Sequence, residues 1–263
     1  GWDGEITASS SQAGQGFLFV TLPAYSSKDF FVELTAPSNL KDGSEVDFVL
    51  KLYKSHNPVG ELPISVLDLG CGDGQIARAL AAQGADVLCV DPTQLHIDVA
   101  NERGGGPRYL LGGATQIPAP DNSCDAVVAC LVFEHIDQMD EAMTEVARVL
   151  KPQGQFSFFL NHPLLQTPGS GWIDDHIIDP PEQYWRIGPY LVETESIEEV
   201  EKNVYIRFIH RPLSRYVNAL IANGMTLERM VEPSPPAGFL ARAPEYALAH
   251  TVPRLLYLRS TKQ

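Results

Sequence analysis

The chain has 263 residues, 44% of them hydrophobic, and a formal net charge of −14 at pH 7. This length allows one large domain or a domain with a cap, and the apolar content allows a sizeable core. The acidic balance argues against phosphate backbones and anionic lipid, so we expect neither a nucleic acid nor a membrane as a partner. No apolar run is long enough to span a bilayer and no signal peptide is visible, so we expect a cytoplasmic protein.

Residues 1–60 are the least regular part of the sequence. Gly, Ser and Gln dominate residues 9–16, and short aromatic and aliphatic runs follow. Ser44 with Asp47 three residues on is a loose form of a helix-starting capping box, and apolar residues then recur at helical spacing. We therefore expect an N-terminal lid or helical segment over residues 1–60, with Tyr25 as a candidate substrate contact.

A glycine-rich turn follows the first strand of the regular part of the chain. The apolar strand contains Asp68, and glycines then occupy alternate positions at Gly70, Gly72 and Gly74. Glycine permits a tight turn and lets the backbone approach a ligand, and the helix that follows presents free N–H groups. The G-x-G-x-G spacing differs from the G-x-G-x-x-G of dinucleotide sites, which disfavours a nicotinamide oxidoreductase.

An acidic residue ends the second strand. The apolar residues 87–90 run into Asp91, and Pro92 comes directly after it. A carboxylate at this place can accept hydrogen bonds from both hydroxyls of a ribose. The alternative role for Asp91 is to cap the helix that Pro92 opens.

Strand and helix patterns alternate from Ile64 to about Leu160. This succession predicts an α/β fold with a doubly wound, mostly parallel sheet. Ligands of such sheets bind at the carboxyl ends of the strands, near the point where the strand order reverses. The strand ends that we expect on this rim are residues 70–74, 91, 114–115, 131–135 and 161–162.

The motifs in this region resemble, in order, those of class I S-adenosylmethionine-dependent methyltransferases of the type 11, small-molecule kind. The matches are the glycine loop with Asp68 and Asp91, and the segments 112–118, 121–128, 133–136 and 148–154. The resemblance implies a Rossmann-like sheet of seven strands, S-adenosylmethionine as the cofactor, and S-adenosylhomocysteine as the product.

The resemblance also implies which residues bind the cofactor. The family uses an acidic residue at the position of Asp68 to hold the ammonium group, often through water, and the alternative role of Asp68 is to cap the turn. Asp91 corresponds to the ribose ligand. Gly113 stands where the family has an acidic residue for the adenine amine, so only backbone groups beside it can read the ring edge. The complete set implied is Asp68, Gly70, Cys71, Gly72, Gly74, Asp91, Pro92, Ala114, Thr115, Cys130 and Leu131.

Two histidines at strand ends are candidate general bases. His135 follows the fourth strand and His162 follows the fifth, close to where the methyl group would point. Either imidazole can take a proton from a hydroxyl or an amine near neutral pH. The alternative role of His135, with Glu134, is to stabilise the helix start that follows. We expect no metal site, and we expect the four cysteines to be reduced and structural.

Residues 161–211 interrupt the alternation. We interpret them as a substrate cap inserted between a cofactor-binding core over residues 61–160 and a C-terminal part of the core over residues 212–263. Aromatic side chains in a cap suit an apolar or ring-bearing small molecule, although they can also form the cap's own core. The candidate substrate residues are Trp172, Tyr184, Trp185 and His210; the alternative for His210 is to anchor the cap.

The sequence therefore predicts methyl transfer to an oxygen, nitrogen or carbon of a small, apolar or aromatic metabolite, by a monomer or homodimer. An RNA or protein methyltransferase is a second hypothesis. The charge disfavours RNA, and the segment at Asn161 lacks the Asn-Pro-Pro-Tyr pattern of base-amine methylation. A third hypothesis is a catalytically inactive, cofactor-binding regulator, which Gly113 keeps open.

Overall fold

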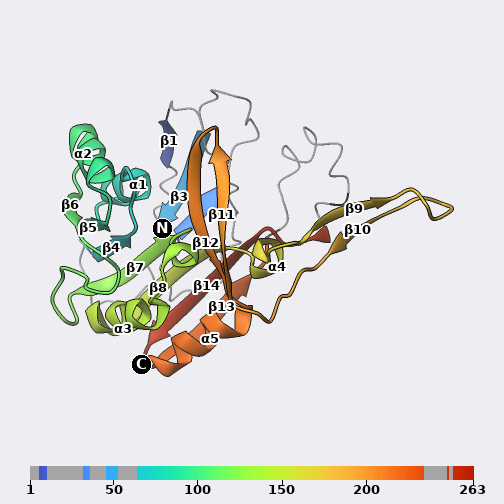
Figure 1. Ribbon diagram of the computed structural model, residues 1–263. Helices are drawn as coiled ribbons and strands as arrows, with labels where there is room; N and C mark the ends of the chain where they lie inside the picture. Colours follow the sequence, from blue (N-terminus) through green and yellow to red (C-terminus); the bar gives the residue numbers. More distant parts are fainter. Residues whose placement is uncertain (1–5, 11–31, 36–45, 53–63, 234–247, 249–250) are drawn as a thin grey trace.

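The computed structural model describes residues 6–10, 32–35, 46–52, 64–233, 248 and 251–263 (Figure 1). Its centre is a seven-stranded sheet in the order β13-β14-β8-β7-β4-β5-β6. Five strands run parallel, namely β4 (Ser65–Leu69), β5 (Asp86–Asp91), β6 (Arg108–Leu111), β7 (Cys124–Cys130) and β8 (Leu150–Asn161). At one edge, β14 (Leu255–Lys262) and β13 (Met225–Val231) are antiparallel. The predicted doubly wound, mostly parallel sheet is confirmed.

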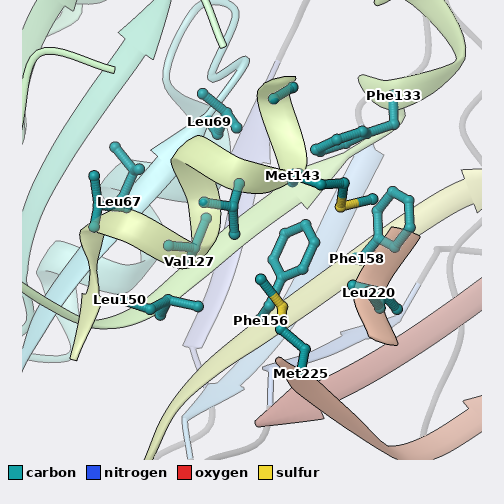
Figure 2. Close-up of a cluster of buried hydrophobic side chains, with 14 of the residues drawn as sticks. Leu67, Leu69, Val127, Phe133, Met143, Leu150, Phe156, Phe158, Leu220 and Met225 are labelled. Carbon is teal, nitrogen blue, oxygen red and sulfur yellow. The ribbon is translucent and has the colours of Figure 1, made fainter. Parts of the chain in front are cut away.

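Helices cover both faces of this sheet because successive side chains of a buried parallel strand point to opposite sides. Leu67 and Leu69 face one cluster, which also holds side chains of α3 (Met139–Val149) and α5 (Leu213–Ala222). Val66 faces the other cluster, with side chains of α1 (Gln75–Ala82) and α2 (Gln94–Arg103). Figure 2 shows the first cluster, where Phe156 and Phe158 lie among Met143 and Leu220.

Two antiparallel hairpins lie outside the main sheet. Beyond β8 and the short helix α4 (Pro163–Gln166), β9 (Gly171–Asp175) pairs with β10 (Glu182–Arg186). The second hairpin pairs β11 (Thr194–Glu201) with β12 (Val204–His210). Figure 1 shows the β9–β10 hairpin extending away from the seven-stranded sheet. The strand β12 instead contacts the 3₁₀ turn η1 (Phe133–His135), which follows β7.

The described parts of the N-terminal region form a three-stranded antiparallel sheet in the order β1-β3-β2. Its strands are β1 (Ile6–Ser10), β2 (Val32–Thr35) and β3 (Val46–Leu52). The helix expected from Ser44 is therefore wrong over residues 46–52. Apolar residues occur at every second position from Val46 to Leu52, and two partner strands provide the ladder, so strand pairing prevails over a weak helix-start signal.

Two further observations bear on the expectations from composition. In the ranges that the structure describes, none of the helices combines the length and the apolar character needed to cross a membrane. All four cysteines are free thiols, as predicted, and three of them are buried. The division of the chain into lid, core, cap and C-terminal part stays a prediction.

Candidate active site

The strand order reverses at β4, because β5 lies on one side of it and β7 on the other. The carboxyl ends of these three parallel strands therefore meet at one rim of the sheet. The glycine loop follows β4, Asp91 ends β5, and Leu131 follows β7. The structure thus brings together most of the residues that the sequence assigned to the cofactor.

The glycine loop depends on backbone conformations that other residues rarely adopt. Gly70, Gly72 and Gly74 have φ angles of +72°, +53° and +81°. A Cβ on Gly70 would come within 2.4 Å of Val132, and one on Gly74 within 2.5 Å of Tyr109. A Cβ on Gly72 would meet nothing within 4 Å. Close packing against other side chains thus explains why residues 70 and 74 are glycines. At Gly72 no atom of the described residues fills the space, so a ligand can approach the backbone.

Asp68 is a buried carboxylate beside this loop. Its side chain is 2% exposed, the backbone N–H of Ala77 donates a hydrogen bond to it, and Oδ2 has no hydrogen-bond partner among the described residues. Burial is the main cause that raises the pKa of Asp68 to about 7; the Ala77 hydrogen bond acts in the opposite direction and the nearby Asp91 carboxylate adds to the rise. A buried oxygen without a partner is costly, so a cationic amine would be a fitting ligand for it.

Asp91 connects the loop to the start of α2. The N–H of Gly72 donates to Oδ2 at 2.9 Å, and the N–H of Thr93 donates to Oδ1 at 2.9 Å. The Nδ1 atom of His96 lies 3.2 Å from Oδ1. A carboxylate has about four acceptor positions, so these bonds leave capacity for ribose hydroxyls. Asp91 therefore fixes the turn that leads into α2 but does not cap the helix, because Thr93 is the N-cap residue and no described side chain caps this helix. This role is compatible with the cofactor role.

The loop after β6 lies beside Asp91. The N–H of Gly112 donates to the carbonyl oxygen of Asp91 at 3.1 Å, and Gly113 forms an isolated bridge with Gln116. This closed turn presents Ala114, which is half-buried, and the exposed Thr115. The turn lies at the end of β5 that also carries the candidate ribose ligand.

Backbone strain marks the end of β7. Leu131 has a φ of +57°, which is uncommon for a residue with a Cβ, and its N–H donates to the carbonyl of Phe159 at 3.0 Å. Such strain costs on the order of 1–3 kcal/mol and is found preferentially at functional sites. Leu131 follows Cys130, and both are half-buried.

Together, the hydrogen-bonding groups of these residues fit S-adenosylmethionine. Asp68 offers an unpartnered buried acceptor for an amine, and Asp91 offers acceptor positions for a ribose. Gly72 offers an open backbone next to the N-terminus of α1.

His135 is held in one tautomer. Its Nδ1 lies 2.7 Å from the carbonyl oxygen of Arg207, and a carbonyl only accepts, so Nδ1 carries the hydrogen. The Nε2 atom of the neutral ring then carries the lone pair, which is the form that a general base needs. The ring also packs on Phe208, with 4.6 Å between ring centroids.

His162 has partners at both ring nitrogens. The N–H of Leu164 donates to Nδ1 at 3.1 Å, so Nε2 carries the hydrogen and donates to Glu232 Oε1 at 2.8 Å. Burial lowers the pKa of His162, although Glu232 acts in the opposite direction. These bonds cap the helix α4 and weigh against the predicted role of His162 as a base.

The structure does not bring the candidate aromatic residues to the glycine loop. Trp172 and Trp185 face each other across the β9–β10 hairpin in an edge-to-face contact, with ring centroids 5.4 Å apart, and Tyr184 is exposed. This hairpin extends away from the sheet (Figure 1). His210 is buried, and its Nε2 lies 2.8 Å from the carbonyl oxygen of Tyr190. A substrate role for these four residues stays a prediction, and Tyr25 lies outside the described residues.

Sequence reasoning missed the importance of Arg211. Its side chain is 4% exposed and donates to the carbonyl oxygens of Phe133 at 3.1 Å, Ile136 at 2.7 Å and Asp137 at 3.0 Å. These bonds tie the start of α5 to the turn that carries His135. A lone arginine directly after an apolar strand was the available signal, because a buried guanidinium needs several acceptors.

Comparisons with known proteins agree with this geometry. The family described as "Methyltransferase domain" matches residues 67–158. An uncharacterized methyltransferase of Mycobacterium tuberculosis is 41% identical over 108 residues, which cover 41% of this chain and 43% of the relative. The malonyl-[acyl-carrier protein] O-methyltransferase of Serratia marcescens is 34% identical over 108 residues, covering 41% and 42%. The chain thus spans less than half the length of these relatives.

The fold matches solved structures over a longer range. An S-adenosylmethionine-dependent methyltransferase from Mesorhizobium loti superposes with a TM-score of 0.65 and 26% identity, over 76% of this chain and 91% of that one. Residues 67–158 therefore match the methyltransferase-domain family, and the seven-stranded sheet around them has the fold of S-adenosylmethionine-dependent methyltransferases. The resemblance found in the motifs is confirmed.

Proposed function

We propose that this chain transfers a methyl group from S-adenosylmethionine to an oxygen, nitrogen or carbon of a small, apolar or aromatic metabolite. The observation that carries the proposal is the pair of buried carboxylates, Asp68 and Asp91, at neighbouring strand ends around an open glycine. The names of two relatives, which methylate malonyl-acyl-carrier protein and act in ubiquinone biosynthesis, support an oxygen acceptor.

Each residue of the site has a defined task in this proposal. When bound, S-adenosylmethionine supplies an electrophilic methyl group on a sulfonium sulfur. Asp68 binds the amine and Asp91 binds the ribose. Ala114 and Thr115 offer backbone groups to the adenine. His135 takes the proton that a hydroxyl or amine loses, and it takes that proton at Nε2 because Nδ1–H is bonded to Arg207.

Calorimetry with S-adenosylhomocysteine and with NAD tests the cofactor. We expect S-adenosylhomocysteine to bind and NAD not to bind, because the loop lacks the dinucleotide spacing. Binding of NAD alone would overturn the proposal. A panel of phenols, amines and carboxylic acids, followed by release of S-adenosylhomocysteine, then separates an enzyme from an inactive regulator, and transfer RNA belongs in the same panel.

Variants of the two histidines test the base. His135→Gln is expected to lower turnover by about 10²-fold or more, the usual contribution of general base catalysis, while sparing cofactor affinity. His162→Asn keeps an acceptor for the N–H of Leu164 and should retain most of the turnover. The reverse pattern would return the base role to His162.

A further inference from the structure

A third buried carboxylate lies at the same rim, and the function proposed above does not use it. Glu134, in the turn η1 after β7, is 2% exposed. Its Oε1 accepts hydrogen bonds from the backbone N–H of Asn161 at 3.3 Å and from Asn161 Nδ2 at 3.0 Å. In the part of the chain that the structure describes, Oε2 has no hydrogen-bond partner.

These two bonds determine which way the Asn161 amide points. Glu134 Oε1 accepts the backbone N–H of Asn161, so it acts as an acceptor, and its second partner must be the NH₂ group of the side chain. A proton on Glu134 would therefore sit on Oε2, and burial raises the pKa of this carboxyl. Because Nδ2 of Asn161 points toward Glu134, the carbonyl oxygen Oδ1 of the same amide points away from Glu134.

Asn161 lies at the rim where the other site residues meet. It is the last residue of β8 and is half-buried. Phe159, two residues earlier, accepts the N–H of the strained Leu131, so the ends of β7 and β8 are directly bonded. Glu134 and the candidate base His135 are consecutive residues of η1. An acceptor of fixed orientation therefore stands beside the strand ends that carry the cofactor and base candidates.

We propose that Asn161 Oδ1 accepts a hydrogen bond from an N–H or O–H group of the methyl acceptor, at or beside the reacting atom, and that Glu134 is the positioning residue that orients it. This inference rests on the proposed function and narrows its substrate class. An amine acceptor satisfies the amide oxygen with a second N–H. A hydroxyl acceptor gives its only proton to His135, so it satisfies the amide oxygen through a donor group beside the reacting atom. A carbon acceptor without such a neighbouring donor leaves the amide oxygen unpaired. Such an unpaired polar group opposes binding of the wrong substrate.

A cofactor analogue tests this placement without a known substrate. Sinefungin carries an aliphatic ammonium group where S-adenosylmethionine carries the sulfonium methyl, so it places N–H donors at the transfer position. We compare its dissociation constant with that of S-adenosylhomocysteine by calorimetry. The intact protein is expected to prefer sinefungin by roughly tenfold, the effect of one charged hydrogen bond. Asn161→Leu should abolish this preference and leave S-adenosylhomocysteine binding within about twofold.

Three further variants separate orientation from bulk effects. Glu134→Gln keeps an oxygen that can accept both N–H groups of Asn161, so it should retain most of the preference. Glu134→Leu frees the amide and should lose the preference. Asn101→Leu is the matched control, because among the described residues the side chain of Asn101 bonds only its own helix, at the carbonyl oxygen of Ile97. It should leave both dissociation constants unchanged.

The outcomes that would contradict this inference differ from those that would contradict the proposed function. An unchanged sinefungin preference in Asn161→Leu, or no preference in the intact protein, would overturn the inference. Failure of the intact protein to bind either ligand would instead contradict the proposed function. If the leucine variants do not fold, the side-chain amide resonances of Asn161 in the intact protein give the answer. They should move on addition of sinefungin and stay in place with S-adenosylhomocysteine, and equal behaviour with both ligands overturns the inference.

Discussion

Buried carboxylates dominate the chemistry of this site at the scale of single residues. Asp68, Asp91 and Glu134 are 2%, 5% and 2% exposed, and they lie in β4, at the end of β5 and in the turn after β7, which are three neighbouring strands. Removing an anion from water is costly, so each needs partners or a shifted pKa. Asp91 has its partners within the protein, whereas Asp68 and Glu134 each keep one oxygen without a partner among the described residues. A ligand can therefore supply a missing hydrogen-bond partner to Asp68 and Glu134, whereas Asp91 already has partners in the protein.

Replacing Asp91 tests the predicted ribose site. Asp91→Ala should weaken S-adenosylhomocysteine binding by about 1–3 kcal/mol, because hydrogen bonds to a charged acceptor are lost. Calorimetry measures the change. Asp98→Ala, which removes an exposed carboxylate of the same helix region, is the control and should have no effect. Unchanged affinity in a folded Asp91→Ala protein would contradict the site.

The pKa of Asp68 predicts a pH dependence of stability in the free protein. This pKa is about 7 in the folded state, against an ordinary value of 3.8 for an aspartic acid side chain, so folding takes up a proton between these two pH values. The free energy of unfolding therefore decreases as the pH rises from about 4 to about 7, by at most about 4 kcal/mol. Asp68→Asn should remove this slope and be the more stable protein above pH 7. Urea denaturation of both proteins across this range is the measurement, and parallel curves would contradict the assignment.

At the scale of secondary-structure elements, two arginines fix the position of the turn η1 by hydrogen bonds. Arg211 donates to three carbonyl oxygens at and after this turn, and Arg207 forms two 2.6 Å bonds to Asp137. The turn carries both Glu134 and His135. Its position relative to β8 and β12 is therefore set by side chains that come from a distant part of the sequence.

Arg211→Met should lower the free energy of unfolding by about 3 kcal/mol, because three carbonyl oxygens lose the charged donor that the buried guanidinium provides. Chemical denaturation provides the measurement. Arg215→Met is a matched control, because Arg215 lies in the first turn of α5, four residues after Arg211. Its half-exposed ion pair with Asp140 should contribute about 1 kcal/mol or less. Equal losses in the two variants would show that burial does not decide the effect.

At the scale of the whole molecule, the fold separates the candidate cofactor site from the β9–β10 hairpin. The sheet and its four long helices hold the glycine loop, whereas the hairpin extends to one side (Figure 1). Replacing residues 171–186 by a short Gly-Ser linker should therefore leave S-adenosylhomocysteine affinity within about twofold. Calorimetry on the shortened chain is the test, and a large loss of affinity would show that the hairpin supports the core. Turnover of the same chain tests the predicted substrate role of Trp172, Tyr184 and Trp185.

Local patterns were sufficient wherever the physical cause is local. The glycine spacing, the acidic residue at the end of β5 and the alternation of strand and helix depend on neighbours in sequence, and they led to the correct fold and family. The helix expected from Ser44 was wrong because the outcome there depends on pairing with β1 and β2, which lie elsewhere in the sequence.

The sequence by itself determined the sheet, its helices and the cofactor family, because backbone geometry and hydrophobic period act over a few residues. Only the tertiary structure showed how the hydrogen bonds of the two histidines differ. His135 and His162 look alike in sequence, but Arg207 leaves a lone pair on one ring, while Leu164 and Glu232 occupy both nitrogens of the other. The orientation of Asn161 is likewise decided by Glu134. Hydrogen bonds between distant segments set the tautomer and direction of a side chain, and no local pattern encodes them.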